Sequence, residues 1–259
     1  MYTINEYKYL SVDMHNGIAV VTFQRPAKLN AINIRMSNEI HSALHAISAD
    51  IDCRAVIITG SGRGFCSGWD LSEGSSGQQN SDTYNITNIS QHIMEIPQPV
   101  IGAINGIAAG IGLSIAMSAD IRIAAESSKF SCIFVKRSLV PDGGATIMLQ
   151  YLLGKGIAME MSLTGNIYDS EWALSRGLIN QLTPDSLLLH SAFEIAAIIA
   201  SNPPLAVRAV KGIMNEVTQL LPKVIESENK ANNLLLQTGD FQESILAFEE
   251  KRPPTYKGV

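Results

Sequence analysis

In the first fifty residues, two short apolar runs typical of strands are followed by apolar residues at helical spacing. Two runs, Tyr7–Asp13 and Gly17–Phe23, flank the turn-forming sequence His15-Asn16-Gly17 and predict a hairpin of two strands. Residues 24–31 are predicted to be loop. Apolar residues then recur with helical spacing over Ile34–Ala49, which predicts an amphipathic helix. Its apolar face carries Met36, Ile40, Leu44 and Ile47.

Further along, short apolar runs alternate with longer amphipathic segments. Three runs predict buried strands, at Ala55–Thr59, Val100–Ile104 and Ile121–Ala125. Helices are predicted at Thr83–Ile96, Gly110–Ala119, 145–153, Lys155–Leu163, Ser170–Arg176, Asp185–Ala200, Pro203–Val217, Pro222–Gln237 and Phe241–Lys251. Strand and helix therefore alternate over the first two-thirds of the chain, and the last third is nearly all helix. This order predicts an α/β fold.

The stretch Val100–Asp120 carries the main indication of a ligand site. A predicted strand breaks at Asn105-Gly106 and leads into a helix with small residues at alternate positions: Gly112, Ser114, Ala116 and Ser118. The first N–H groups of a helix have no internal partner, and small side chains let a ligand approach them. An anion, or an oxygen that becomes one, suits such a helix end. A tightly packed core helix with no ligand is the alternative that the residues leave open.

A second glycine-rich break, Gly60–Gly68, has four glycines in nine residues and follows the predicted strand Ala55–Thr59. Neither break has the spacing of a P-loop or of a dinucleotide-binding loop, so phosphate binding of those kinds is not predicted. The polar stretch Ser72–Asn80 is predicted to be a lid or a disordered loop.

Composition narrows the class of protein. The chain has 259 residues, of which 46% are hydrophobic and 17% charged, enough apolar material for one large domain. Its net charge is −5 and no basic block occurs, which argues against nucleic acid or an anionic membrane as the main partner. No apolar run reaches the length of a membrane span, and the first residues lack a signal-peptide pattern.

The cysteines point the same way. Cys53, Cys66 and Cys132 are odd in number and widely spaced, which fits neither a disulfide framework nor a Cys-x-x-Cys metal site. We therefore expect a reduced, cytoplasmic setting and no bound metal.

Seven segments in order resemble the crotonase superfamily of enoyl-CoA hydratases and isomerases. They are Arg25–Ala31, Gly62–Leu71, Pro99–Gly112, Ala119–Arg122, Lys129-Phe130, Leu139–Gly144 and Phe248–Arg252. The resemblance implies a crotonase-like spiral of strand–strand–helix repeats over residues 1–200 and a C-terminal helical trimerisation region over 201–259. It also implies a homotrimer or a dimer of trimers, an acyl-CoA thioester as substrate, and no cofactor apart from the coenzyme A of that substrate.

The resemblance also implies how the thioester is held. Its oxygen would accept hydrogen bonds from the backbone N–H groups of Cys66 and Ile111, which would stabilise an enolate. Ile111 stands where the family usually has glycine, so its side chain is expected to narrow the pocket. Arg25 and Lys28 would lie near the CoA phosphates and Ala31 near the adenine, although two solvated loop cations are the alternative. The other implied substrate contacts are Ser67, Gly68, Asp70, Leu71 and Gly110, with Trp69 shaping the acyl pocket.

The catalytic residues depart from those of a hydratase. By motif register, the two glutamates of a family hydratase fall at Ser114 and Phe134, which are expected to line the pocket. Neither residue exchanges a proton readily, so hydration by the usual pair is disfavoured.

The acid that remains is Asp142, in a motif that resembles the epoxyphenylacetyl-CoA ring isomerase and related enoyl-CoA isomerases. The resemblance implies that Asp142 is the acid/base of a double-bond or ring isomerisation. An aspartate before Gly-Gly at a helix start is also an ordinary helix cap, and that alternative remains. Two further alternatives are a thioester hydrolase or decarboxylase, on CoA or an acyl carrier protein, and a catalytically silent acyl-CoA binder.

Overall fold

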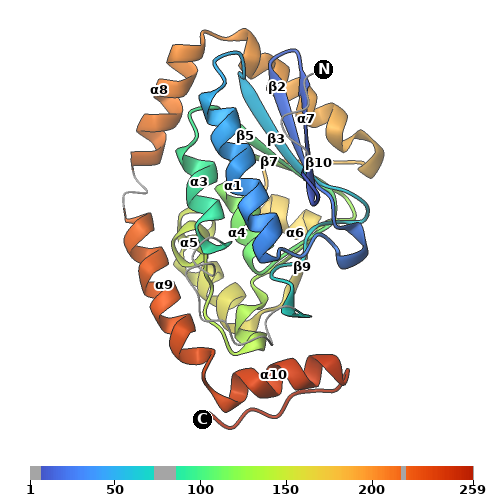
Figure 1. Cartoon of the computed structure of the whole chain (residues 1–259), viewed down its shortest axis with the longest axis vertical. Coiled ribbons are helices and arrows are strands. Elements are labelled where there is room, and N and C mark those ends of the chain that lie inside the picture. The colour runs from blue at the N-terminus through green and yellow to red at the C-terminus, as the bar shows by residue number, and fades with distance from the viewer. Residues whose placement is uncertain (1–6, 73–85, 217–219, 259) are drawn as a thin grey trace.

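Two β-sheets organise the computed structural model, which describes residues 7–72, 86–216 and 220–258 (Figure 1). Within these residues the larger sheet has six strands in the order β1-β2-β3-β5-β7-β10, and the smaller has four in the order β4-β6-β8-β9. The larger sheet comprises β1 (Leu10–His15), β2 (Ile18–Phe23), β3 (Ala55–Gly60), β5 (Val100–Ile104), β7 (Ile121–Ala125) and β10 (Gln181–Thr183). The smaller comprises β4 (Gly64–Cys66), β6 (Ile107–Ala109), β8 (Lys129–Ser131) and β9 (Ile167–Asp169).

The chain passes from the larger sheet to the smaller one three times in succession. β3 is followed by β4, β5 by β6, and β7 by β8, and each pair leads toward a helical segment. The strand pairs β3–β5, β5–β7, β4–β6 and β6–β8 are all parallel, whereas β1–β2 and β8–β9 are antiparallel. This topology confirms the predicted crotonase-like spiral of strand–strand–helix turns.

Helices surround the sheets and form the C-terminal part of the chain. They are η1 (Pro26–Lys28), α1 (Ile34–Ala49), α3 (Ile89–Glu95), α4 (Ile111–Ser118), η3 (Ile133–Arg137), α5 (Ala145–Thr164), α6 (Ser170–Ser175), η4 (Asp185–Leu187), α7 (Leu188–Ser201), α8 (Pro204–Asn215), α9 (Leu221–Leu235) and α10 (Gly239–Glu249). The two helices predicted over 145–163 are one element that bends at Gly154, whose φ of 75° is not helical.

Both faces of the larger sheet are buried, which explains its uninterrupted apolar strands. Val56 and Ile58 of β3 point to one face, where they join a core that includes the predicted apolar face of α1. Ala55 and Ile57 point to the other face, where they pack with Leu188 of α7. In Figure 1, α1 and α3 lie on one side of the sheet and α7 on the other. The alternation along β3 therefore separates two cores rather than a core from solvent.

Several sequence expectations need correction. The smaller sheet was not predicted, and neither was β10, because each of these strands has only three residues and shows no period. Residues 24–31 are not all loop, since they contain η1. The predicted helix over 83–96 is broken at Asn88 before α3, and its start lies outside the described residues. Apart from Ser72, the stretch 72–80 predicted as a lid also lies outside them.

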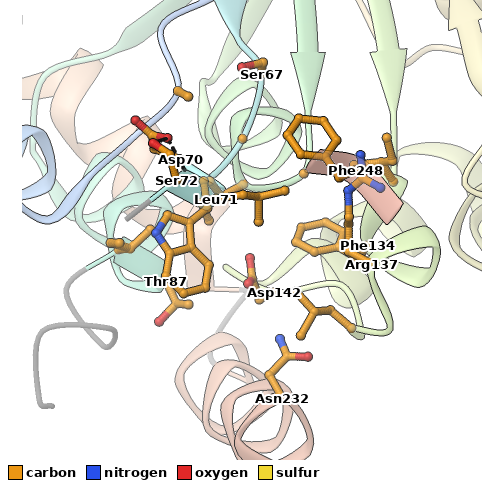
Figure 2. Close-up of a pocket in the computed structure, with 18 of the residues that line it drawn as sticks. Ser67, Asp70, Leu71, Ser72, Thr87, Phe134, Arg137, Asp142, Asn232 and Phe248 are labelled. Carbon is orange, nitrogen blue, oxygen red and sulfur yellow. Dashed lines mark hydrogen bonds between the residues drawn. The ribbon is translucent and has the colours of Figure 1, made fainter. Parts of the chain in front are cut away.

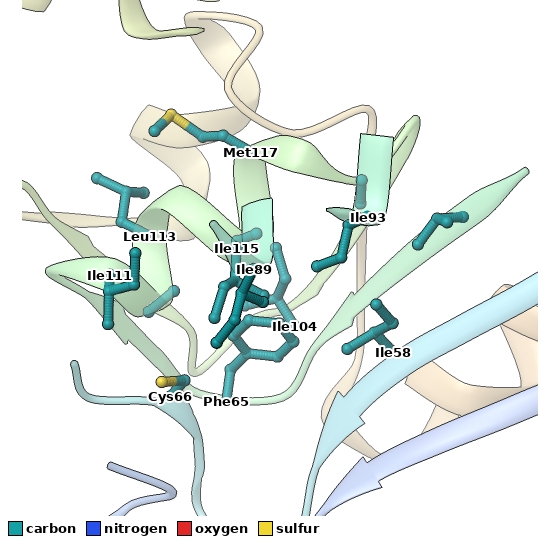
Figure 3. Close-up of a cluster of buried hydrophobic side chains, with 14 of the residues drawn as sticks. Ile58, Phe65, Cys66, Ile89, Ile93, Ile104, Ile111, Leu113, Ile115 and Met117 are labelled. Carbon is teal, nitrogen blue, oxygen red and sulfur yellow. The ribbon is translucent and has the colours of Figure 1, made fainter. Parts of the chain in front are cut away.

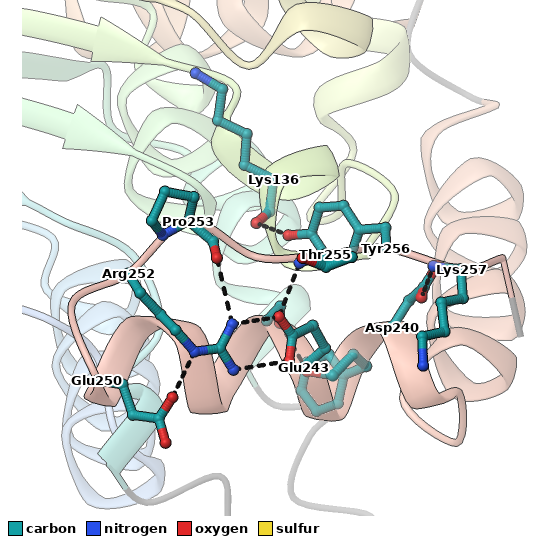
Figure 4. Close-up of polar contacts among 11 residues, drawn as sticks. Lys136, Asp240, Glu243, Glu250, Arg252, Pro253, Thr255, Tyr256 and Lys257 are labelled. Atoms are coloured by element: carbon teal, nitrogen blue, oxygen red, sulfur yellow. Dashed lines mark hydrogen bonds and ion pairs between the residues drawn. The ribbon is translucent and has the colours of Figure 1, made fainter.

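Polar contacts fasten the C-terminal helices to the spiral. Lys211 of α8 is only 7% exposed and forms an ion pair of 2.9 Å with Asp120, which follows α4. Beyond α10 the chain turns back along the helix, where Arg252 pairs with Glu243 at 2.6 Å (Figure 4). The Tyr256 hydroxyl then donates to the Lys136 carbonyl of η3 at 2.7 Å. The C-terminal segment is thereby held beside η3. The domain boundary predicted at residue 200 remains a prediction.

No single helix among the described residues is both long enough and apolar enough to cross a membrane. One pair of segments, Asp185–Ser201 and Pro204–Asn215, meets that test only when taken together, and it is bent by 110°.

We expect Gly112→Ala to destabilise the protein by about 1–3 kcal/mol, because overpacking without space to relax costs that much. A Cβ on Gly112 would lie 2.1 Å from the carbonyl oxygen of Cys66, which belongs to the backbone of β4 and cannot rotate away. Gly212, in the last turn of α8, is the matched control because its Cβ would meet nothing within 4 Å. Gly212→Ala should stabilise by about 0.5–1 kcal/mol through helix propensity. Urea unfolding of both variants measures the difference, and equal effects would contradict the expectation.

Candidate active site

A cavity of about 500 Å³ opens between the bend after β4, the start of α4, the loop before α5, and the helices α9 and α10. Most of the predicted site residues line it, and mainly apolar groups surround it. Those that line it are Lys28, Ala31, Ser67, Gly68, Trp69, Asp70, Leu71, Gly110, Ile111, Phe134 and Asp142. Three predicted residues, Arg25, Cys66 and Ser114, are not among its lining residues.

The two glycine-rich bends identified in the sequence contact one another beside this cavity. A Cβ on Gly68 would lie 3.2 Å from the Ala109 carbonyl oxygen, and one on Gly110 would lie 3.7 Å from the Gly68 Cα. Both glycines have positive φ, 114° and 55°, a region that side chains disfavour. Together with Gly112 against Cys66, these contacts place the end of β4 and the first turn of α4 backbone to backbone. Segments about forty residues apart in sequence therefore form one wall of the cavity.

Cys66 and Ile111 occupy the two sides of this contact (Figure 3). Cys66 is fully buried, and burial raises the pKa of its thiol to about 12, so the thiol stays protonated at neutral pH. Its side chain is therefore a poor nucleophile. Ile111 is the first residue of α4, so its N–H has no acceptor within that helix. The Ile111 side chain packs toward Gly143, where a Cβ would lie 2.5 Å from its Cδ1.

Asp142 presents its carboxyl group to the same cavity, between Leu71 and Phe134 (Figure 2). Its Oδ1 atom is buried and has no hydrogen-bond partner among the described residues. Burial, and then the charge of Glu228, raise the pKa of Asp142 to about 8. An acid with a pKa in this range can both accept and donate a proton near neutral pH.

The alternative that Asp142 only caps a helix is wrong. The residue at the N-cap of α5 is Gly144, which has no side chain that could bond to the helix. The amide of Gly144 donates instead to Glu228 of α9, at 2.7 Å, and the amide of Thr146 donates to the same carboxylate at 3.1 Å. The Asp142 carboxyl is thus not used to satisfy the helix end.

Ser114 and Asn232 hold the loop that carries Asp142. Ser114 is fully buried rather than part of the cavity wall, and its hydroxyl donates to the Asp142 carbonyl at 2.8 Å. Asn232 of α9 accepts from the Val140 amide at 2.8 Å and donates to the Val140 carbonyl at 3.2 Å. The loop is therefore fixed to α4 on one side and to α9 on the other. Phe134, at the other predicted glutamate position, is 5% exposed and lines the cavity.

The predicted CoA-binding cations differ in their surroundings. The Arg25 guanidinium forms an ion pair of 2.7 Å with Asp70 and also donates to the Ala31 carbonyl. Burial acts to raise the pKa of Asp70, but hydrogen bonds from Ser72 and Arg25 outweigh it and lower that pKa. Asp70 therefore stays ionised, and Arg25 is engaged within the loop. Lys28 is exposed at the cavity edge.

Other cavity residues were missed by sequence reasoning. One group comes from α9, the residue after it, and α10: Asn229, Asn232, Asn233, Leu236 and Phe248. The others are Ala27, Leu29, Arg63, Ser72, Ile86, Thr87, Ile133, Arg137 and Leu139. Phe248 lies in a quoted motif that was given no role, and the Arg137 guanidinium lies 4.8 Å from its ring centre. Glu228, Asn229 and Asn232 of α9 are polar, yet each is at most 7% exposed in the structure. In the sequence, the only sign of these contacts was the group of polar residues along this helix.

Comparisons with known proteins agree with this geometry. The family model described as enoyl-CoA hydratase/isomerase matches residues 13–259. The chain is 37% identical over 256 residues to a probable enoyl-CoA hydratase of Rhodobacter capsulatus, covering 97% of this chain and 99% of that protein. It is 32% identical over 259 residues to the 1,2-epoxyphenylacetyl-CoA isomerase of Escherichia coli, again covering 97% and 99%.

A solved structure of an enoyl-CoA hydratase/isomerase from Pseudoalteromonas atlantica superposes with a TM-score of 0.91 at 29% identity, covering 96% of this chain and all of that one. The sequence match spans nearly the whole chain, and the strand–strand–helix spiral and the glycine-lined cavity accord with it. The chain therefore belongs to the enoyl-CoA hydratase/isomerase family of the crotonase superfamily.

Proposed function

We propose that this protein isomerises the double bond or ring of an acyl-CoA thioester, with Asp142 as the single proton shuttle. The observation that carries the proposal is the buried, unpartnered Oδ1 of Asp142 in an apolar cavity beside the start of α4. Among the described residues that line the cavity the only other acid is Asp70, and Arg25 neutralises it. One available carboxyl group suits proton transfer between two carbons better than the two-acid addition of water.

In the proposed reaction the same proton is removed from one carbon of the substrate and returned to another. The Asp142 carboxylate removes a proton from a carbon conjugated with the thioester, and the electron pair moves onto the thioester oxygen to give an enolate. The N–H groups of Cys66 and Ile111 donate to this oxygen; one such donor is typically worth about 3–4 kcal/mol of barrier. Asp142 then returns the proton to a different carbon, and the double bond forms again in its new position.

The remaining substrate contacts are those that the family resemblance implies, and most of their residues line the cavity. Lys28 lies near the CoA phosphates, and Ala31 near the adenine. Ser67, Gly68, Leu71 and Gly110 contact the substrate along the two bends, while Trp69 and Phe134 bound the acyl group. Arg25 acts indirectly, because its guanidinium holds Asp70 and the Ala31 carbonyl in place. No further cofactor takes part in this chemistry, and we place the enzyme in the cytoplasm.

Asp142→Asn should lower the turnover of a 3-enoyl-CoA or 2-enoyl-CoA isomer by about 10²–10⁴-fold, the usual worth of a general acid/base. The dissociation constant for the CoA ester should change by less than about threefold, because the amide keeps the shape of the carboxyl. Product is followed by the absorbance of the conjugated thioester and by mass spectrometry of the acyl-CoA. Asp52→Asn, an exposed aspartate, serves as the control.

Unchanged turnover in Asp142→Asn would exclude Asp142 as the proton shuttle. Release of free CoA or CO₂ from the same thioester panel would instead indicate a hydrolase or a decarboxylase. Tight CoA-ester binding with no product would indicate a silent binder.

The raised pKa of Asp142 also predicts a pH-dependent stability. Between pH values of about 4 and 8 the folded protein keeps the Asp142 proton, whereas the unfolded chain has lost it. This contribution to the free energy of unfolding is complete below about pH 4 and is lost as the pH rises toward 8. The asparagine in Asp142→Asn cannot ionise. The free energy of unfolding of this variant should therefore be roughly 1–3 kcal/mol larger than that of the wild type at pH 9, and the difference should vanish near pH 4. Thermal unfolding across this range measures it; a difference independent of pH would contradict the assignment.

The same family resemblance supports a homotrimer or a dimer of trimers. Large apolar side chains are exposed on the C-terminal helices, including Leu205 at 79%, Ile213 at 66% and Leu234 at 71%. Exposed apolar side chains of this size are common on surfaces that another protein covers. Light scattering should give three or six times the chain mass of 28.0 kDa. Leu205→Glu together with Ile213→Glu should reduce it to that of one chain, and a monomeric wild type would exclude the assembly.

A further inference from the structure

A carboxylate from the C-terminal region takes the place of a cap at the start of α5. Glu228 of α9 is 4% exposed, and its Oε2 accepts from the Gly144 amide at 2.7 Å. Its Oε1 accepts from the Thr146 amide at 3.1 Å and from the Thr146 hydroxyl at 2.5 Å. Helix N-terminal amides are strong partners for an anion, so these three bonds hold a charged side chain in a buried position.

The amides that an aspartate cap would use at this position have other partners. A capping aspartate accepts from the amide two or three residues after it, and such bonds favour its charged form. For Asp142 these are the amides of Gly144, which donates to Glu228, and of Ala145, which donates to the Asp142 carbonyl at 3.1 Å. The Asp142 Oδ1 has no partner among the described residues.

We propose that Glu228 is a positioning residue for the reaction: by capping α5 and placing a second negative charge behind Asp142, it keeps the Asp142 carboxyl protonatable at neutral pH. This inference rests on the proposed role of Asp142 as the proton shuttle. Glu228 itself does not line the cavity and touches no substrate. Asp142 starts the reaction as the carboxylate, and the charge of Glu228 makes it a stronger base for the proton that it takes and later returns.

The electrostatic surroundings support this role. Glu228 is the group whose charge, after burial, raises the pKa of Asp142. Burial also raises the pKa of Glu228, while the bonds from Thr146 and Gly144 act in the opposite direction. Of the titratable groups among the described residues, Asp70, Lys28, Arg63 and Arg137 line the cavity with Asp142, and Cys132 before η3 interacts with its charge. The neighbouring elements also carry Lys136 on η3, His92 and Glu95 on α3, Tyr151, Lys155 and Glu160 farther along α5, and Lys223, Glu226 and Lys230 on α9. Residues 111–118 of α4 and the first turn of α5 have none.

The test is the pH dependence of kcat/KM for isomerisation in Glu228→Gln. The acid limb of the profile reports the ionisation of the base in the free enzyme. We expect this limb to move to lower pH by about one unit, because the charge of Glu228 no longer raises the pKa of Asp142. Glutamine keeps the size of the side chain and loses its charge. A limb that stays at the wild-type position would overturn the proposal.

Ser114→Ala is the matched control. It removes another hydrogen bond to the same loop, at the Asp142 carbonyl, without changing any charge. A loss of rate and of melting temperature is expected in this variant, with the acid limb unchanged. If the limb moved equally in Ser114→Ala and Glu228→Gln, loosening of the loop would explain the shift, and the proposal would be wrong.

A second measurement does not require Glu228→Gln to fold. Coupling between two ionisable groups is reciprocal, so the Glu228 carboxyl must respond when Asp142 ionises. Glu228 loses its proton first, while Asp142 is still neutral, so carbon-13 NMR of glutamate-labelled wild type should show a small second inflection of the Glu228 signal at the pH where Asp142 ionises, and Asp142→Asn should lack it. A wild-type signal without the second inflection would refute the coupling.

The two hypotheses fail separately. Full activity in Asp142→Asn removes the shuttle but leaves the NMR titration to decide the coupling. Loss of activity in Asp142→Asn with an unmoved acid limb in Glu228→Gln retains the shuttle and rejects Glu228.

Discussion

The close approach of two backbone segments is the constraint on which the rest of the structure depends. The first turn of α4 lies against the end of β4 because Gly112 has no side chain to meet the Cys66 carbonyl. Gly68 and Gly110 meet in the same way, in conformations that other residues rarely adopt. The N-terminus of α4 thereby lies beside the bend that follows β4, and both line the cavity. The apolar strands on either side supply the rigidity that holds this contact.

Hydrophobic pattern and glycine content were sufficient to predict this arrangement in outline. The apolar run of Val100–Ile104, its break at Asn105-Gly106 and the small residues after Gly110 indicated a strand, a turn and an approachable helix, and the structure has all three. The smaller sheet escaped prediction because strands of three residues, such as Ile107–Ala109, are fixed by their neighbours and not by a period of their own. The polar face of α9 also escaped, since its partners lie more than eighty residues earlier in the chain.

Ser114 and Phe134 occupy the positions at which motif register predicts the two hydratase glutamates, and both are neutral. Ser114 does not replace a glutamate chemically; its hydroxyl is turned to the Asp142 carbonyl and supports the residue that is the candidate acid. Phe134 adds apolar surface to the cavity wall, which favours the neutral form of any carboxyl nearby. Neutral side chains at these two positions and a buried carboxyl at Asp142 are therefore parts of one consistent environment. Among the described residues that line the cavity, only Asp142 and Asp70 are acids, and Asp70 is paired with Arg25.

Asp142 and Asp70 illustrate how the same side chain takes opposite states within one cavity. Asp70 accepts hydrogen bonds from Ser72 and Arg25, and these bonds outweigh the cost of its burial. At Asp142, burial acts more strongly and the Oδ1 has no hydrogen-bond partner among the described residues. The two acids therefore differ both in burial and in the hydrogen bonds that they accept. The Glu228 carboxylate, which comes from the C-terminal helices, accepts from the Gly144 amide, and its charge acts on Asp142 in the same direction as burial. The C-terminal region is therefore part of the electrostatics of the candidate site as well as one of its walls.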